Sequence, residues 1–161
     1  MRIEKREIAA IVLCLTIIGA SVFVVVFPIL NTIPFETVDQ GIHCGITARV
    51  QYVITDNETW EQLWTDIHSI SSHLPDLPMI NFTSETLIAV FMGEKHIGGY
   101  STEITRITSS WNAYTVHVTD YHPDPESLAL NWFTQPYHIV RIPSERNLSL
   151  HFVNQTIITP M

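Results

Sequence analysis

Eight histidines are the first side chains in this sequence to consider for chemistry, because clustered histidines could bind a metal ion. None of them lies in an H-E-x-x-H motif or in the Cys/His spacing of a zinc knuckle. His117 and His122 are five residues apart, so along one strand they would point to opposite faces. His43 and Cys44 are adjacent and diverge for the same reason. The spacing therefore predicts no bound metal, and no motif indicates a cofactor.

Two further residue types could support catalysis, a thiol and a pair of carboxylates. A Cys44 nucleophile would need a histidine base within hydrogen-bond reach and a third group to orient that base, and no local signature supplies either. Asp124 and Glu126 flank prolines, which is typical of a solvated turn rather than of a catalytic carboxylate pair. We expect no catalytic residue in this chain.

The most distinctive short stretch is residues 95–101, in which two glycines precede Tyr100. It lacks the spacing of a phosphate-binding loop, and it leads into a strand pattern rather than into the helix that a phosphate cradle or a nucleophile elbow requires. Adjacent glycines before a large aromatic residue predict either a tight bend or a close approach to another surface, and we expect the bend first. The candidate partner-binding residues are Lys95, His96, Gly98, Gly99, Tyr100 and, in a separate loop, Trp132.

One helix must help to position these loops. Apolar residues recur at i, i+3, i+4 and i+7 over Trp60, Leu63, Trp64 and Ile67, which predicts one buried helical stripe that ends near residue 69. Thr55 and Glu58 have the spacing of a capping box at its start. At this spacing the two tryptophans indicate core packing rather than a sugar-stacking platform.

Strand patterns account for most of the remaining chain. They lie at residues 46–54, 87–92, 100–105, 114–119, 137–142 and 148–152. No crossover helices separate them. We therefore expect an α+β domain, with a mainly antiparallel sheet of about six strands and one packed amphipathic helix.

The N-terminal residues differ in composition from the rest of the chain. Three Lys/Arg precede an uncharged apolar run over residues 8–30, which as a helix spans roughly 35 Å. This run predicts a single transmembrane helix that acts as a signal-anchor and not as a cleaved signal. By the positive-inside rule, residues 1–34 comprise a cytoplasmic N-terminus, the anchor and a short spacer, and residues 35–161 lie outside the cell membrane.

The expected outer domain is acidic. Residues 35–161 contain five Lys/Arg and fourteen Asp/Glu, a formal net charge of −9. This charge argues against binding to nucleic acid and against docking on anionic lipid. A single cysteine excludes an intrachain disulfide in this region. Candidate glycosylation sequons start at Asn57, Asn81, Asn147 and Asn154.

Taken in order, several of these segments resemble the C-terminal domain of the PrcB family, a subunit of a bacterial surface protease complex. The specific part of the resemblance is Met92-Gly93 followed by Gly98-Gly99-Tyr100-Ser101, and the strand that starts at Pro136 also fits. The resemblance covers residues 35 to about 142. It implies a non-catalytic subunit that binds or stabilises a protease or another surface protein.

Three functions are consistent with the sequence. The first is a membrane-anchored, non-catalytic extracytoplasmic interaction module for a surface protease or another envelope protein. The second is a module that binds a cell-envelope glycan or ligand through Tyr100, Trp111 or Trp132. The third is a hydrolase whose site only the folded chain would assemble.

Overall fold

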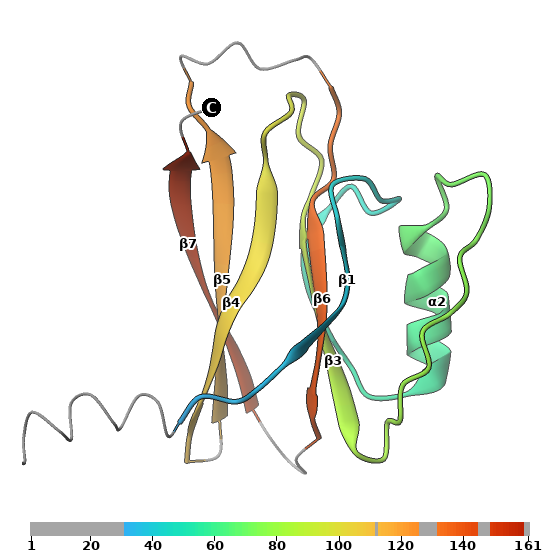
Figure 1. Ribbon diagram of the computed structural model, residues 1–161, viewed down its shortest axis with the longest axis vertical. Helices are drawn as coiled ribbons and strands as arrows, with labels where there is room; N and C mark the ends of the chain where they lie inside the picture. Colours follow the sequence, from blue (N-terminus) through green and yellow to red (C-terminus); the bar gives the residue numbers. More distant parts are fainter. Residues whose placement is uncertain (1–30, 112, 126–131, 145–148, 160–161) are drawn as a thin grey trace, which may run out of the picture. The chain divides into compact units, whose positions relative to one another are not determined.

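The computed structural model describes residues 31–111, 113–125, 132–144 and 149–159. These residues form seven strands and one helix (Figure 1). The elements are β1 (Glu36–Gly41), β2 (Arg49–Ile54), α2 (Asn57–Ile67), β3 (Glu85–Met92), β4 (Ser101–Ser110), β5 (Ala113–Pro123), β6 (Tyr137–Pro143) and β7 (Ser149–Thr159).

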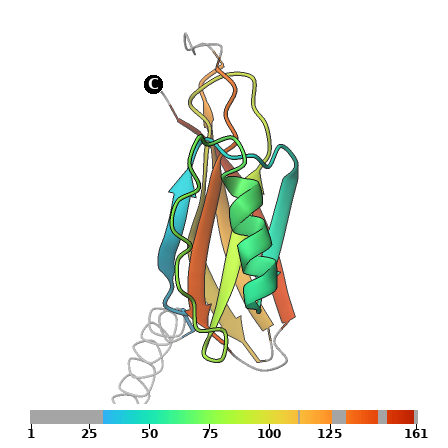
Figure 2. The same cartoon turned by 90° about the vertical axis from the view of Figure 1, so that its right-hand side faces the viewer.

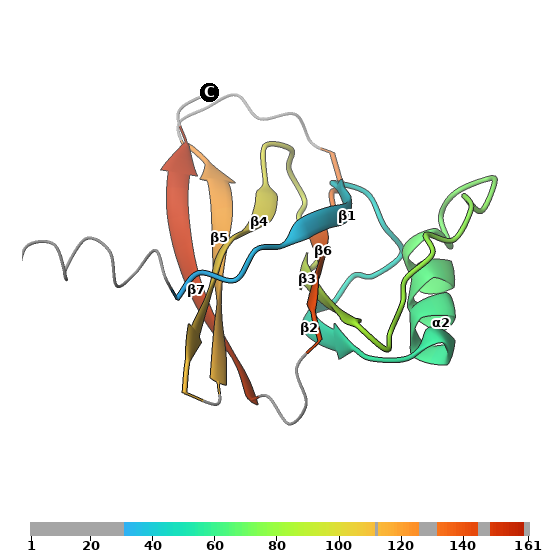
Figure 3. The ribbon, with the colours of Figure 1, turned by 60° about the horizontal axis from the view of Figure 1, so that its bottom comes forward.

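The strands are divided between two sheets. One sheet has the order β1-β6-β3-β2 and is antiparallel throughout. The other has the order β4-β5-β7, in which β4 and β5 are antiparallel and β5 and β7 are parallel. The sheets lie face to face, and α2 covers the outer face of the four-stranded sheet, so that the domain has three layers (Figure 3).

Strand β3 lies at the centre of this arrangement and is buried on both faces. Leu87, Ala89 and Phe91 face the core beneath α2, whereas Ile88 and Val90 face the second sheet. Two-sided burial is the reason that this strand is continuously apolar and does not alternate.

Helix α2 buries the apolar stripe that the sequence predicts, and it lies along the sheet face in Figure 2. The predicted capping box is wrong in detail, because the N-cap is Asp56, whose carboxylate accepts a 2.8 Å hydrogen bond from the backbone N–H of Thr59. The helix ends at Ile67. The indole N–H groups of Trp60 and Trp64 donate to backbone carbonyls of the following loop, which holds that loop against the helix.

The predicted fold class is wrong. The described residues form a mostly β domain with two sheets and one short helix, in place of one sheet of about six strands. Strand β1 was not predicted, because its partly exposed residues lack the apolar alternation of a strand with one buried face. Strand β7 extends over 11 residues, much further than predicted, and it pairs in parallel with β5.

The transmembrane helix included in the expected architecture also has no support. Among the residues that the structure describes, no helix is long and apolar enough to cross a membrane. The run over residues 8–30, on which the prediction depends, lies outside the described residues. The boundary between residues 1–34 and 35–161 stays a prediction.

Candidate functional site

Two loops that are distant in sequence meet at one end of the domain. Lys95, after β3, and Thr134, before β6, form an antiparallel bridge in which each backbone N–H donates to the other residue's carbonyl, at 2.8 and 2.9 Å. The side chain of Gln135 adds a 3.1 Å hydrogen bond to the carboxylate of Glu94. This bridge brings the candidate residues after β3 close to Trp132.

Aromatic and histidine side chains gather around the bridge. The His96 and Phe133 rings meet edge to face with centroids 5.1 Å apart, and the His43 and Trp132 rings lie 5.8 Å apart. We name the loop-end patch as the set Ile42, His43, Lys95, His96, Tyr100, Trp132 and Phe133. Three of its apolar side chains are exposed: Ile42 at 47%, Trp132 at 57% and Phe133 at 57%. Exposed apolar groups concentrated on neighbouring loops are typical of an interaction surface.

Tyr100 lies at the edge of the loop-end patch, where β4 begins. Its ring meets the His122 ring edge to face at 5.0 Å, and the Lys95 ammonium lies 5.5 Å from its centroid, within cation–π range. These contacts orient the phenol ring, so Tyr100 forms a fixed part of the patch.

The glycines of the predicted bend do not have equal roles. Gly99 has a φ of +90°, a conformation that a side chain rarely adopts, whereas Gly98 is outside the positive-φ region. Gly93, at the end of β3, has a φ of +76°, and a Cβ there would lie 2.8 Å from the backbone nitrogen of Arg49. Sequence reasoning noted the Gly93 spacing and missed this close approach of β3 to β2.

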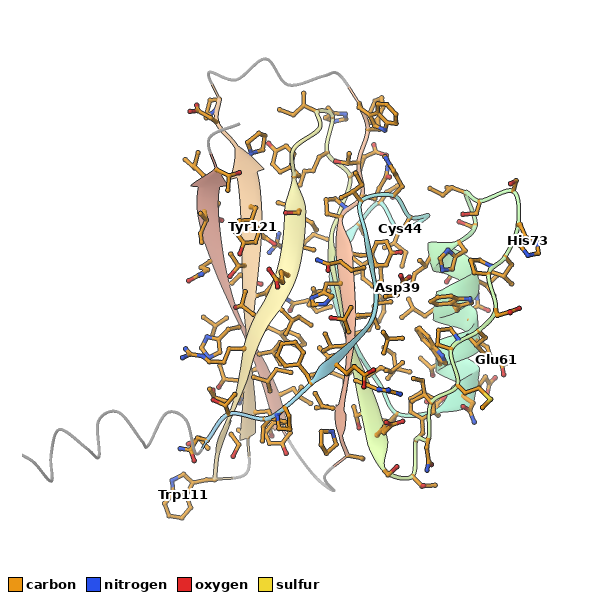
Figure 4. All side chains as sticks on the ribbon, in the orientation of Figure 1. Asp39, Cys44, Glu61, His73, Trp111 and Tyr121 are labelled. Carbon is orange, nitrogen blue, oxygen red and sulfur yellow. The ribbon has the colours of Figure 1, made fainter. Side chains whose placement is uncertain are left out.

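Trp111 is not part of the loop-end patch. It lies in the hairpin between β4 and β5 with φ of 51° and is fully exposed, and it projects beyond the strand ends in Figure 4. Tyr100 precedes β4 and Trp111 follows it, so the ten-residue strand separates them by roughly 33 Å. The aromatic residues that the glycan hypothesis invokes therefore do not form one surface.

The Cys44 thiol has the surroundings of a packed core residue. It is 1% exposed, and its Sγ lies 3.4 Å from the carbonyl of Gln135 and 3.7 Å from that of Ile46. Burial, as the main cause, raises the pKa of the Cys44 thiol, with the negative charge of Asp39 acting in the same direction. A thiol kept protonated in this way is a poor nucleophile.

A small polar cluster lies near Cys44, between β1, β6 and the end of α2. The Tyr137 hydroxyl donates a 2.8 Å hydrogen bond to the carboxylate of Asp39, and burial followed by this contact raises the pKa of Tyr137. The His68 ring meets the Trp64 ring edge to face, and its Nε2 lies 3.8 Å from the Asp39 carboxylate. Asp39 and Cys44 are labelled in Figure 4. Sequence reasoning missed this cluster because its members come from three separate elements.

Within the described part of the chain, no group of three or more His, Cys, Asp or Glu side chains could hold a metal ion. His117 and His122 lie on the same strand, β5. His122 contacts Tyr100, whereas His117 lies beside the hydroxyl of Thr108 at 3.4 Å.

Three of the four sequons lie in the described residues, and their asparagines are all exposed. Asn57 is the first residue of α2. Asn81 accepts hydrogen bonds from the backbone N–H and the hydroxyl of Thr83, and Asn154 accepts one from Gln51. Asn147 lies outside the described residues.

Fold and surface together define a class of protein: a two-sheet β domain whose distinctive side chains gather on exposed loops at one end. The family model described as PrcB C-terminal matches residues 86–143, which confirms the predicted resemblance over that segment. The matched segment contains both loops that carry the bridge. No curated protein and no solved structure matches the chain.

Proposed function

We propose that this domain is a non-catalytic interaction module and that its loop-end patch contacts a protease or another surface protein. The observation that carries the proposal is the bridge between Lys95 and Thr134, which joins two exposed aromatic loops inside the PrcB-like segment. The raised pKa of the buried Cys44 thiol supports a role without covalent catalysis.

Site-specific crosslinking tests this proposal. A photoreactive phenylalanine analogue at position 132, in the full chain in its native cells, is expected to crosslink a defined partner protein. Phe133→Ala in the same chain is expected to reduce the yield, because hot-spot side chains at an interface act as a cluster. The analogue at position 111 is the control, because this position is more exposed than position 132 and lies at the end of β4 away from Tyr100. Equal recovery from both positions, or none above background, would contradict the proposal.

A second candidate is a glycan-binding module, and the 57% exposure of Trp132 beside His43 favours it. Sugar rings stack on exposed tryptophan faces. Binding of the full chain to a glycan array that is lost in Trp132→Ala and retained in Trp111→Ala would favour a glycan over a protein as the partner.

The outer side of the cell membrane is the location that we propose for this domain. Its acidic composition and the three exposed sequon asparagines support that location. A protease added to intact cells should degrade the domain. Survival of the domain until the cells are lysed would contradict the proposal.

A further inference from the structure

A groove runs between the edge strand β2 and helix α2, on the opposite side of the helix from the loop that its tryptophans hold. The helix and the strand beside it are visible in Figure 2. The groove holds about 630 Å³ of open space and is lined by Tyr52 from β2 and by one face of α2 that includes Glu58, Glu61, Gln62 and Asp66. These elements lie outside the segment that matches the PrcB family model.

Strand β2, which contributes Tyr52 to the lining of the groove, has an open edge. β2 pairs with β3 along one side and is the last strand of its sheet in the part of the chain that the structure describes. Alternate residues of such a strand direct their N–H and C=O groups away from the sheet. The six residues of β2 contain no proline or glycine and extend roughly 20 Å, enough to pair with a short added strand.

The face of α2 that lines the groove is negatively charged. Glu58, Glu61 and Asp66 lie along one face of α2, and no lysine or arginine lines the groove. Arg49, the basic residue of β2, points toward the second sheet and forms a 2.6 Å ion pair with Asp120. No described lysine or arginine forms an ion pair with any of the three groove carboxylates.

Tyr52 adds a surface for side chains. It lies on the groove side of β2, is 37% exposed, and its ring is oriented by an edge-to-face contact with Phe91 at 5.9 Å. A ring in this position can pack against the methylene stem of a lysine or arginine and attract its charge.

We propose that this groove binds an extended peptide segment that carries Lys or Arg, and that the segment adds to β2 as a further strand. Backbone hydrogen bonds to the open edge supply affinity, and the carboxylates of α2 select basic side chains on the face of the added strand that points toward the helix. This mode of binding is independent of the loop-end patch. A partner protein with a basic extended segment could therefore occupy both surfaces.

Fluorescence anisotropy of the full chain with a labelled octapeptide of alternating lysine and valine tests the proposal. Two control probes have the same length: one replaces lysine by glutamate, and the other carries N-methyl groups at alternate residues. We expect the lysine probe to bind and the glutamate probe not to bind. The N-methylated probe should bind at least about 10-fold more weakly because it cannot donate the backbone hydrogen bonds.

Matched variants locate the binding. The double variant Glu58→Gln/Glu61→Gln should weaken binding of the lysine probe by about 5-fold or more. The double variant Asp76→Asn/Glu103→Gln removes the same charge elsewhere and should leave binding unchanged. Equal loss of binding in both double variants would contradict the proposal, because it would show only general attraction between the lysine probe and an acidic protein. Equal binding of the N-methylated probe would overturn strand addition. A concentration-dependent dimer of the free chain that competes with the probe would overturn the basic peptide as the occupant of the groove.

Discussion

His138 of β6 joins the two sheets through one buried hydrogen bond: its Nδ1 accepts from the backbone N–H of Ile104 in β4 at 2.9 Å. The ring is 2% exposed. Because Nδ1 accepts, the neutral ring carries its proton on Nε2, which donates to the hydroxyl of Thr37 at 2.9 Å. Burial lowers the pKa of His138 below the usual histidine value. The buried imidazole is therefore neutral, and protonation of Nδ1 would break the bond between the sheets.

Stability should consequently fall in mild acid. Since the folded-state pKa of His138 is below its unfolded value of about 6.5, the unfolded chain binds more protons below that pH. The stabilisation is complete above pH 6.5 and is lost as the pH falls toward the folded-state pKa. Burial also lowers the pKa of His117, which adds to the effect in the same direction. Urea unfolding followed by tryptophan fluorescence between pH 5 and 8 measures it.

His138→Leu should unfold more easily at pH 7.5, by about 1–3 kcal/mol, because the Ile104 N–H is left buried without an acceptor. Its stability should also depend less on pH than that of the parent chain. His73→Gln, in an exposed loop, is the control and should change neither quantity. An unchanged pH slope in His138→Leu would show that other groups cause it.

Gly99 and Gly98 should respond differently to substitution. Gly99→Val forces a β-branched residue into a φ of +90° and should lower the free energy of unfolding by at least about 1 kcal/mol. Gly98→Val should cost clearly less, since Gly98 lies outside the positive-φ region. Thermal unfolding of the two variants compares them directly, and equal losses would contradict the assignment of the bend to Gly99.

Gly93→Ala should be more damaging than either substitution in the bend. It combines a φ of +76° with a Cβ only 2.8 Å from the backbone of Arg49, so β2 and β3 would have to separate there. We expect a loss of more than about 2 kcal/mol in chemical denaturation. A near-neutral result would mean that the start of β2 moves without cost.

The ion pair between Arg49 and Asp120 connects the sheets at a second place. Asp120 is 3% exposed, and besides Arg49 it has a 2.7 Å hydrogen bond from the hydroxyl of Thr102. Arg49→Met should destabilise the domain by about 1–3 kcal/mol, because the buried carboxylate loses its counter-charge. The double variant Arg49→Met/Asp120→Leu should recover part of that loss. Additive losses in urea unfolding would show that the pair is not coupled.

The Cys44 thiol should react only when the domain opens. Its burial and raised pKa both slow attack on a thiol reagent such as Ellman's reagent. With Cys14→Ser in the chain to leave a single thiol, the labelling rate should follow the fraction unfolded as urea increases. Fast labelling of the folded chain would instead indicate an accessible thiolate, which would support the hypothesis that the domain is a hydrolase.

The local elements could be predicted from the residues alone. The structure contains the helical stripe from Trp60 to Ile67 and all of the predicted strands, whereas β1 was not predicted. These elements were predictable because the spacing of apolar residues reflects the geometry of a single helix or strand. The resemblance to the PrcB family could also be predicted from the sequence, since it depends on the spacing of glycines and a tyrosine within one short segment.

The number of sheets could not be predicted in the same way. Alternation shows that one face of a strand is buried, but a second sheet and a helix bury that face equally well. The continuous apolar run of β3 was consistent with burial on both faces, although it did not show what covered each face. The parallel pairing of β7 with β5 depends on a path across the domain that no local pattern records.

By itself, the sequence determined the helix, most of the strands, the acidic character of the domain and the unusual stretch around Gly99. Only the tertiary structure decided that Lys95 meets Thr134, that Trp111 lies far from Tyr100, and that an acidic helix face flanks an open strand edge. The physical reason is that local conformation depends on neighbouring residues, whereas surfaces depend on contacts between segments distant in the chain. Those contacts are fixed by packing both sheets and α2 around β3.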